Sequence, residues 1–168
     1  MNSIEVLADA FERIRDAVHP AVSGLTPDDL AYRPADESNS IAWLVWHLTR
    51  IQDDHVAAVD DGRQVWTSGG WADRFALPLD PADTGYGHDP ETVALVTAES
   101  SLLLGYFEDV HQKTQAFVGS LSEDDLDRVV DSRWDPPVTL QVRLVSVIAD
   151  DLQHVGQAAY VRGIVQRR

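Results

Sequence analysis

The chain has 168 residues, of which 44% are hydrophobic and 24% charged, values typical of one globular domain with its own core. A net charge of −15 opposes contact with phosphate backbones, so nucleic acid is not expected as a partner. The absence of cysteine excludes disulfides and thiolate metal ligands, and no apolar run approaches the roughly 20 residues that cross a membrane. The N-terminal stretch mixes acids and arginines with apolar residues, which argues against a secretory signal and favours a cytoplasmic protein.

Four long amphipathic patterns predict four helices. Ser3 can cap the first, Asn39 or Ser40 the second, and Asp89 followed by Pro90 opens the third. No segment shows sustained alternation of apolar and polar residues, so little or no sheet is expected. The fold class predicted is therefore an all-α four-helix bundle forming a single domain over residues 1–168. Its helices are expected at about residues 3–22, 40–60, 88–118 and 139–162.

A long irregular stretch, residues 61–88, separates the second and third predicted helices. A loop of this length in a compact domain is usually a lid, a binding loop or a mobile segment. Its aromatic residues could line a pocket as a lid, or could plug the open end of the bundle, and the stretch alone favours neither role. These residues are Trp66, Trp71, Phe75 and Tyr86. If the bundle holds a catalytic metal ion, we expect the loop to fold over the bundle end nearest that ion and to line a concave pocket.

A weak repeat relates residues 22–30, VSGLTPDDL, to residues 118–126, VGSLSEDDL. Each copy precedes a predicted helix that carries a histidine-valine pair. The repeat predicts two αα-hairpins related by a pseudo-two-fold axis. The alternative is that the motif is a common helix-capping turn, in which the paired acids bind backbone N–H groups rather than cations.

The stretch DDLQHVGQ places Asp150 and His154 four residues apart in an otherwise apolar helix. Residues at this spacing share one helix face, and a buried carboxylate needs a hydrogen-bond donor, a cation or a metal ion. A structural hydrogen bond is the commoner explanation, and a metal site would need a third ligand. Helix periodicity places His55 near the centre of the second apolar stripe and His47 at its edge, so spacing favours His55.

The sequence resembles the DinB-like helical-bundle superfamily, which includes mycothiol and bacillithiol S-transferases and mycothiol-dependent maleylpyruvate isomerase. The resemblance rests on SIAWLVWHLTRIQDDHV and VIADDLQHVGQAAYVRG, with support from LTPDDLAYRP and LPLDPADTGYG, and it spans essentially the whole chain. Many members carry a second histidine where this chain has Asp150, and the isomerase branch carries glutamate. The resemblance implies metal ligands at His47, Asp150 and His154, and it reverses the preference for His55.

Two imidazoles and one carboxylate suit Zn²⁺, Ni²⁺, Fe²⁺ or Mn²⁺ and leave coordination positions for water or substrate. Gln157 is expected either to orient a ligand from behind or to bond another helix. The resemblance implies a low-molecular-weight thiol such as mycothiol as the nucleophile and a small electrophile as its partner, and the chain has no cysteine thiol of its own.

Two functions remain open at this stage. One is a metal-dependent thiol S-transferase or isomerase. The other is a non-catalytic metal-binding or dimeric helical stress or interaction protein. A homodimer is possible in either case, and Trp43 and Trp46 beside the apolar stripe could supply its face.

Overall fold

Four long helices form the body of the protein. The computed structural model describes all residues from 1 to 168. The long helices enclose one hydrophobic core, and none of the helices is both long and apolar enough to cross a membrane. The mainly α bundle is confirmed. The long helices are α1 (Ser3–Val22), α3 (Ile41–Val59), α7 (Ser100–Ser120) and α8 (Leu140–Val165).

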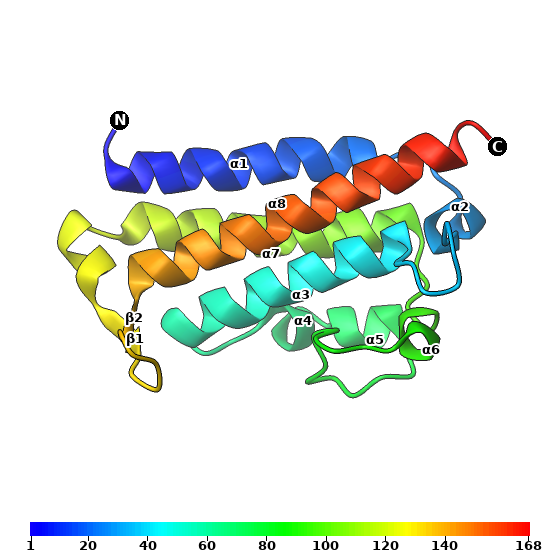
Figure 1. Ribbon diagram of the computed structural model, residues 1–168. Coiled ribbons are helices and arrows are strands. Elements are labelled where there is room, and N and C mark those ends of the chain that lie inside the picture. Colours follow the sequence, from blue (N-terminus) through cyan, green and yellow to red (C-terminus); the bar gives the residue numbers. More distant parts are fainter.

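The two members of each predicted hairpin, α1 with α3 and α7 with α8, lie diagonally across the bundle rather than side by side. α1 packs against α7 and α8, and α3 packs against the same two helices. α1 and α8 run in one direction and α3 and α7 in the other (Figure 1). The predicted pairing into two αα-hairpins is therefore wrong. The connections at residues 23–40 and 121–139 are long enough to span the diagonal, whereas a tight hairpin needs only a short loop.

The repeated turn occurs once in each of these two connections. It begins α2 (Pro27–Ala31) and the 3₁₀ helix η1 (Glu123–Asp127). In both copies a hydroxyl residue and the aspartate three positions later bond each other's backbone N–H groups, Thr26 with Asp29 and Ser122 with Asp125. The paired acids therefore cap helical turns, which is the local role expected of this motif.

The third predicted helix is interrupted. Asp89 caps α6 (Pro90–Val93) by accepting the N–H of Thr92 at 2.8 Å, as expected, but α7 begins only at Ser100. Val96 is buried in the intervening segment, and the Ser100 hydroxyl donates to the carbonyl oxygen of Leu25 at 2.9 Å. The prediction of a continuous helix over residues 88–118 is therefore wrong, because the burial of Val96 and the bond from Ser100 to Leu25 favour a break between α6 and α7.

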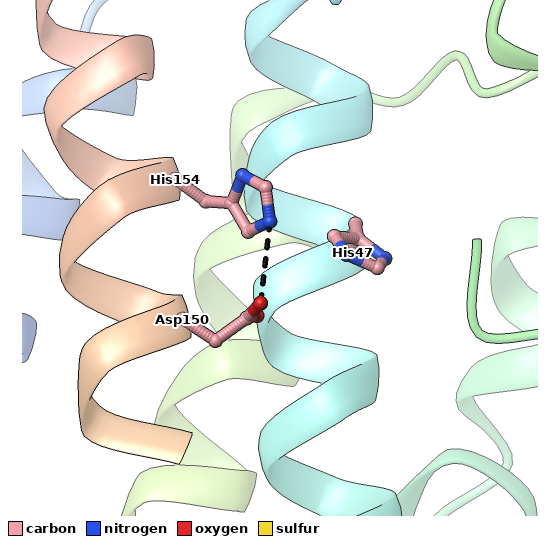
Figure 2. A group of neighbouring side chains, drawn as sticks. All are labelled: His47, Asp150 and His154. Atoms are coloured by element: carbon pink, nitrogen blue, oxygen red, sulfur yellow. Dashed lines mark ion pairs between the residues drawn. The ribbon is translucent and has the colours of Figure 1, made fainter. Parts of the chain in front are cut away.

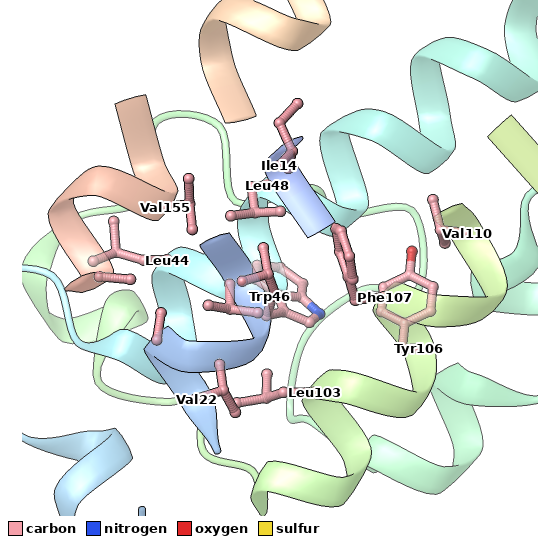
Figure 3. Close-up of a cluster of buried hydrophobic side chains, with 14 of the residues drawn as sticks. Ile14, Val22, Leu44, Trp46, Leu48, Leu103, Tyr106, Phe107, Val110 and Val155 are labelled. Carbon is pink, nitrogen blue, oxygen red and sulfur yellow. The ribbon is translucent and has the colours of Figure 1, made fainter. Parts of the chain in front are cut away.

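Sheet structure is confined to one small hairpin that precedes α8. Its antiparallel strands are β1 (Val129–Asp131) and β2 (Val138–Thr139). Trp46 and Phe107 meet in the core among aliphatic side chains from all four long helices (Figure 3). Trp43 and Trp46 are both buried, so they do not form the exposed face expected for a homodimer.

The segment between α3 and α7 covers the outer side of α3. Besides α6, it contains the short helices α4 (Val65–Ser68) and α5 (Trp71–Phe75). The buried Asp53 carboxylate of α3 accepts the N–H groups of Val65 at 2.8 Å and Trp66 at 2.7 Å, which ties α4 to the bundle. As a result α3 is buried almost all round, and positions at the edge of its apolar stripe also lie inside.

Candidate metal centre

Three side chains from α3 and α8 converge near the middle of these antiparallel helices. His47 lies on α3, and Asp150 and His154 lie one turn apart on α8 (Figure 2). One potential ligand atom from each lies within 4.8 Å of the other two. The two imidazole rings meet edge to face with their centroids 4.8 Å apart. The three residues named by the resemblance are therefore brought together by the fold.

The ring of His47 is fixed by the loop that covers α3. Its Nδ1 lies 2.6 Å from the carbonyl oxygen of Thr84, which can only accept, so Nδ1 carries the proton and Nε2 keeps a lone pair. Trp43 stacks on the other side with ring centroids 4.5 Å apart. Burial lowers the pKa of His47, although the hydrogen bond to Thr84 acts to raise it. The lowered pKa favours the neutral imidazole, which is the form that binds a metal ion.

The ring of His154 is likewise oriented by a hydrogen bond from its Nδ1 atom. Its Nδ1 donates to the side-chain oxygen of Gln157 at 3.1 Å, and its Nε2 lies 3.5 Å from Oδ1 of Asp150. The contact with Asp150 raises the pKa of His154, against the effect of burial. Gln157 thus bonds His154 within α8 and not a residue of another helix. A hydrogen bond to the ring nitrogen that does not face the metal is how a neighbouring residue orients a histidine ligand.

Asp150 supplies the negative charge. Burial acts to raise the pKa of its carboxyl group, but the neighbouring histidines, His154 first, outweigh that effect and leave the pKa below its usual value. Its second oxygen, Oδ2, is buried and has no hydrogen-bond partner. A buried carboxylate oxygen without a donor is costly, and a divalent cation would satisfy it. The donor set of two imidazoles and one carboxylate therefore fits a divalent transition metal.

His55, which the helix periodicity favoured, lies outside this cluster. It is only partly buried, and its Nδ1 accepts a hydrogen bond from Arg143 at 2.9 Å. His47 lies at the edge of the apolar stripe of α3. Such a position would be exposed if other segments packed against only one side of the helix. The loop of residues 61–88 covers the other side and leaves His47 only 5% exposed.

The loop aromatics separate into two groups. Trp66, Trp71 and Phe75 are buried against α7, where the Trp66 ring lies 5.0 Å from that of Tyr106 and the Trp71 indole donates to Asp109 at 2.9 Å. These three side chains therefore pack into the protein interior and do not line a pocket over the cluster. Tyr86, by contrast, is 88% exposed and lines a surface hollow together with Asp150.

The loop reaches the cluster through residues that the sequence did not single out. Gly85 adopts a φ of +88°, and a Cβ atom there would lie 2.7 Å from Nδ1 of His47. His88 accepts the indole N–H of Trp43 at 3.1 Å and donates to Asp83 at 2.9 Å. The stretch DTGYG, with two glycines around one tyrosine, was the available signal of such a close turn.

Comparison with known proteins agrees with this architecture. The model of the mycothiol-S-transferase family matches residues 6–166. The crystal structure of a conserved protein from Enterococcus faecalis superposes with a TM-score of 0.92 at 32% identity, covering 100% of this chain and 99% of that one. Comparison with curated proteins gives no match. The chain therefore belongs to the mycothiol-S-transferase family of the DinB-like superfamily.

Proposed function

We propose that this protein is a divalent-metal-dependent S-transferase that joins a low-molecular-weight thiol, such as mycothiol, to a small electrophile. The observation that carries the proposal is the buried Oδ2 of Asp150, which lacks a hydrogen-bond partner and lies beside two imidazoles whose Nδ1 atoms are bonded to Thr84 and Gln157. Family membership supports the thiol and the electrophile as substrates.

In this proposal His47, Asp150 and His154 hold the cation. Thr84 and Gln157 accept hydrogen bonds from Nδ1 of the two rings, so the neutral form of each imidazole presents Nε2 to the cation. A cation in such a site lowers the pKa of a thiol that binds it, which raises the nucleophilicity available at neutral pH.

The thiol loses its proton, and its sulfur attacks the electrophilic carbon to form a C–S bond. In a substitution the bond to the leaving group breaks, the leaving group departs with its electron pair, and the thiol proton passes to solvent. In an addition the π-bond pair moves onto the acceptor, which takes up a proton in place of the one that the thiol lost. Because the chain has no cysteine, no thiol of the protein competes with the added thiol for the electrophile.

The test begins with metal binding to the purified protein stripped with a chelator and titrated separately with Zn²⁺, Ni²⁺, Fe²⁺ and Mn²⁺. We expect one ion per chain. Asp150→Ala and His47→Ala should each weaken binding by at least about tenfold, because each removes one of three ligands. His55→Ala is the matched control, since it removes a histidine from the same helix but from outside the cluster, and it should leave the stoichiometry unchanged.

The second step measures conjugation of mycothiol to 1-chloro-2,4-dinitrobenzene by absorbance, with and without the bound metal. Catalysis that requires both the metal and Asp150 supports the proposal. Stoichiometric metal with no conjugation of mycothiol or any other small thiol would instead favour a non-catalytic metal-binding protein. Unchanged metal content in the Asp150 and His47 variants would overturn the site itself.

A further inference from the structure

A hollow of about 370 Å³ opens beside the cluster between α3, α8 and the β1–β2 hairpin. It is the right size for a small molecule, since ligand pockets begin at about 300 Å³. Asp150 forms part of its wall, so the hollow and the cluster share a residue. A larger hollow of about 730 Å³ lies further along α8, but its wall includes Gln157 and none of the three cluster residues.

The walls of the smaller hollow are mainly apolar. Two exposed aromatic residues flank it, Tyr86 from the loop that covers α3 and Trp134 from the turn between β1 and β2. They are 88% and 67% exposed, which is unusual for side chains of this size. Exposed apolar groups gathered around one hollow mark a binding surface. Ile51 of α3 and Val142 and Val147 of α8 complete the apolar lining.

The charged groups of the hollow are already paired. Arg143 donates to Nδ1 of His55 at 2.9 Å, and its other terminal nitrogen lies 3.5 Å from the carboxylate of Asp131. The guanidinium is therefore engaged on two sides and is not free to bind an anionic ligand. The net charge of −15 further disfavours an anion. The chemistry of the hollow suits an uncharged, flat, apolar ligand.

We propose that this hollow binds the electrophilic substrate, with an uncharged aromatic or alkyl body held between Tyr86 and Trp134 and the reactive carbon directed toward Asp150. The inference rests on the proposed S-transferase function for the reaction, but the binding surface can be tested without it. Trp134 and Tyr86 would then determine substrate preference, while the cluster acts on the thiol.

The first test is equilibrium dialysis with 2,4-dinitrotoluene, an uncharged aromatic without a leaving group. Trp134→Ala and Tyr86→Ala should each weaken its binding by about three- to tenfold, the range expected for loss of one aromatic contact. Tyr160→Ala is the matched control, because Tyr160 is an exposed aromatic of α8 that lines the larger hollow instead. It should leave binding unchanged.

A second pair of variants tests the wall of α8. Val142→Gln places a polar side chain in the hollow, whereas Val145→Gln makes the same change at a similarly exposed position of the same helix that lines a different hollow. Only the first should weaken binding of 2,4-dinitrotoluene. Equal binding by wild type, Trp134→Ala, Tyr86→Ala and Val142→Gln would overturn the assignment, whether or not the protein conjugates thiols.

Kinetics then distinguish the two substrates. Trp134→Ala should raise KM for 1-chloro-2,4-dinitrobenzene by about three- to tenfold and leave KM for the thiol and the metal content unchanged. A rise in KM for the thiol alone would assign the hollow to the thiol and overturn the inference. Absence of any conjugation would remove the proposed function, and the dialysis result would still decide whether the hollow binds an apolar ligand.

Discussion

Gly85 lets the covering loop touch the ring of His47. Its backbone has a φ of +88°, and a methyl group would approach Nδ1 of His47 to 2.7 Å and the Trp46 ring to 2.9 Å. Gly85→Ala should therefore displace the loop or the imidazole, and metal affinity should fall by about tenfold because the bond to Thr84 that orients His47 is disturbed. Isothermal titration with Zn²⁺ measures the effect.

Gly87 provides the control for that change. It has a similar φ of +75°, but a Cβ atom there would meet no atom within 4 Å. Gly87→Ala should cost a comparable backbone strain of about 1 kcal/mol and leave metal affinity unchanged. Equal loss of metal in the two variants would mean that strain in the turn, and not contact with His47, controls the site.

Asp151 is a second residue whose environment is unusual. It is fully buried on α8, neither carboxylate oxygen has a hydrogen-bond partner, and burial together with the charge of Asp150 raises its pKa well above the usual value. Asp151→Asn removes the ionisable group at nearly constant volume, and with it the cost of burying a carboxyl group that ionises freely in the unfolded chain, so it should raise the free energy of unfolding at pH 7.5 by about 1–3 kcal/mol. Urea denaturation of metal-free protein gives this difference. A destabilised variant with normal metal content would show that the carboxylate has a partner in solution.

At the scale of helices, α1 and α7 are joined by an ion pair that should depend on pH. Arg15 donates to Glu108 at 2.8 Å, and His19 bonds the same carboxylate. Burial acts to raise the pKa of Glu108, but these two partners outweigh it, and the pKa lies below its usual value. The ionised carboxylate therefore contributes stability above its unfolded pKa of about 4.3, and the contribution is lost as pH falls through the lower folded pKa.

Glu108→Gln should lower the free energy of unfolding by about 0.5–1 kcal/mol at pH 7, and the difference from wild type should close below about pH 4. Asp9→Asn serves as the control. It breaks a pair between Asp9 and Arg13 whose side chains are 44% and 73% exposed, and its effect should stay within about 0.5 kcal/mol. A difference for Glu108→Gln that persists at pH 3 would contradict the assignment to the carboxylate charge.

At the scale of the whole molecule, the candidate metal centre links α3 to α8, two antiparallel helices of the same bundle. A cation that binds the folded cluster and not the unfolded chain must stabilise the fold, by about 2.7 kcal/mol at a metal concentration 100 times Kd. Thermal unfolding with Zn²⁺ and with chelator should therefore give different Tm values. The shift should be clearly smaller in Asp150→Ala and unchanged in His55→Ala. An equal shift in Asp150→Ala would mean that the ion stabilises the protein from another site.

Much of the secondary structure could be predicted because it depends on neighbours in the sequence. Asn39–Ser40 and Asp89–Pro90 start helices through bonds to backbone N–H groups within one turn, and Ser40 and Asp89 make those bonds. The shared face of Asp150 and His154 follows from helix geometry alone. The first cap was displaced by one residue, since Asn2 and not Ser3 caps α1.

The predictions that were wrong concern features set by contacts between residues far apart in the sequence. The third helix breaks between Val93 and Ser100, although its local sequence predicts a continuous helix, because burial of Val96 and the bond from Ser100 to Leu25 favour the interrupted path. The diagonal order of the helices depends on which faces match in three dimensions. Helix periodicity does not contain that information.

The sequence by itself determined the number of long helices, most of their caps, the absence of a cysteine side chain and the Asp150–His154 pair, because each depends on composition or on spacing within one turn. Only the tertiary structure decided that His47 and not His55 joins that pair. His47 is buried because residues 61–88 fold over the side of α3 that its apolar stripe leaves uncovered, and Thr84 then turns Nε2 toward the cluster. The energy of that contact arises between residues 37 positions apart, so no local pattern encodes it.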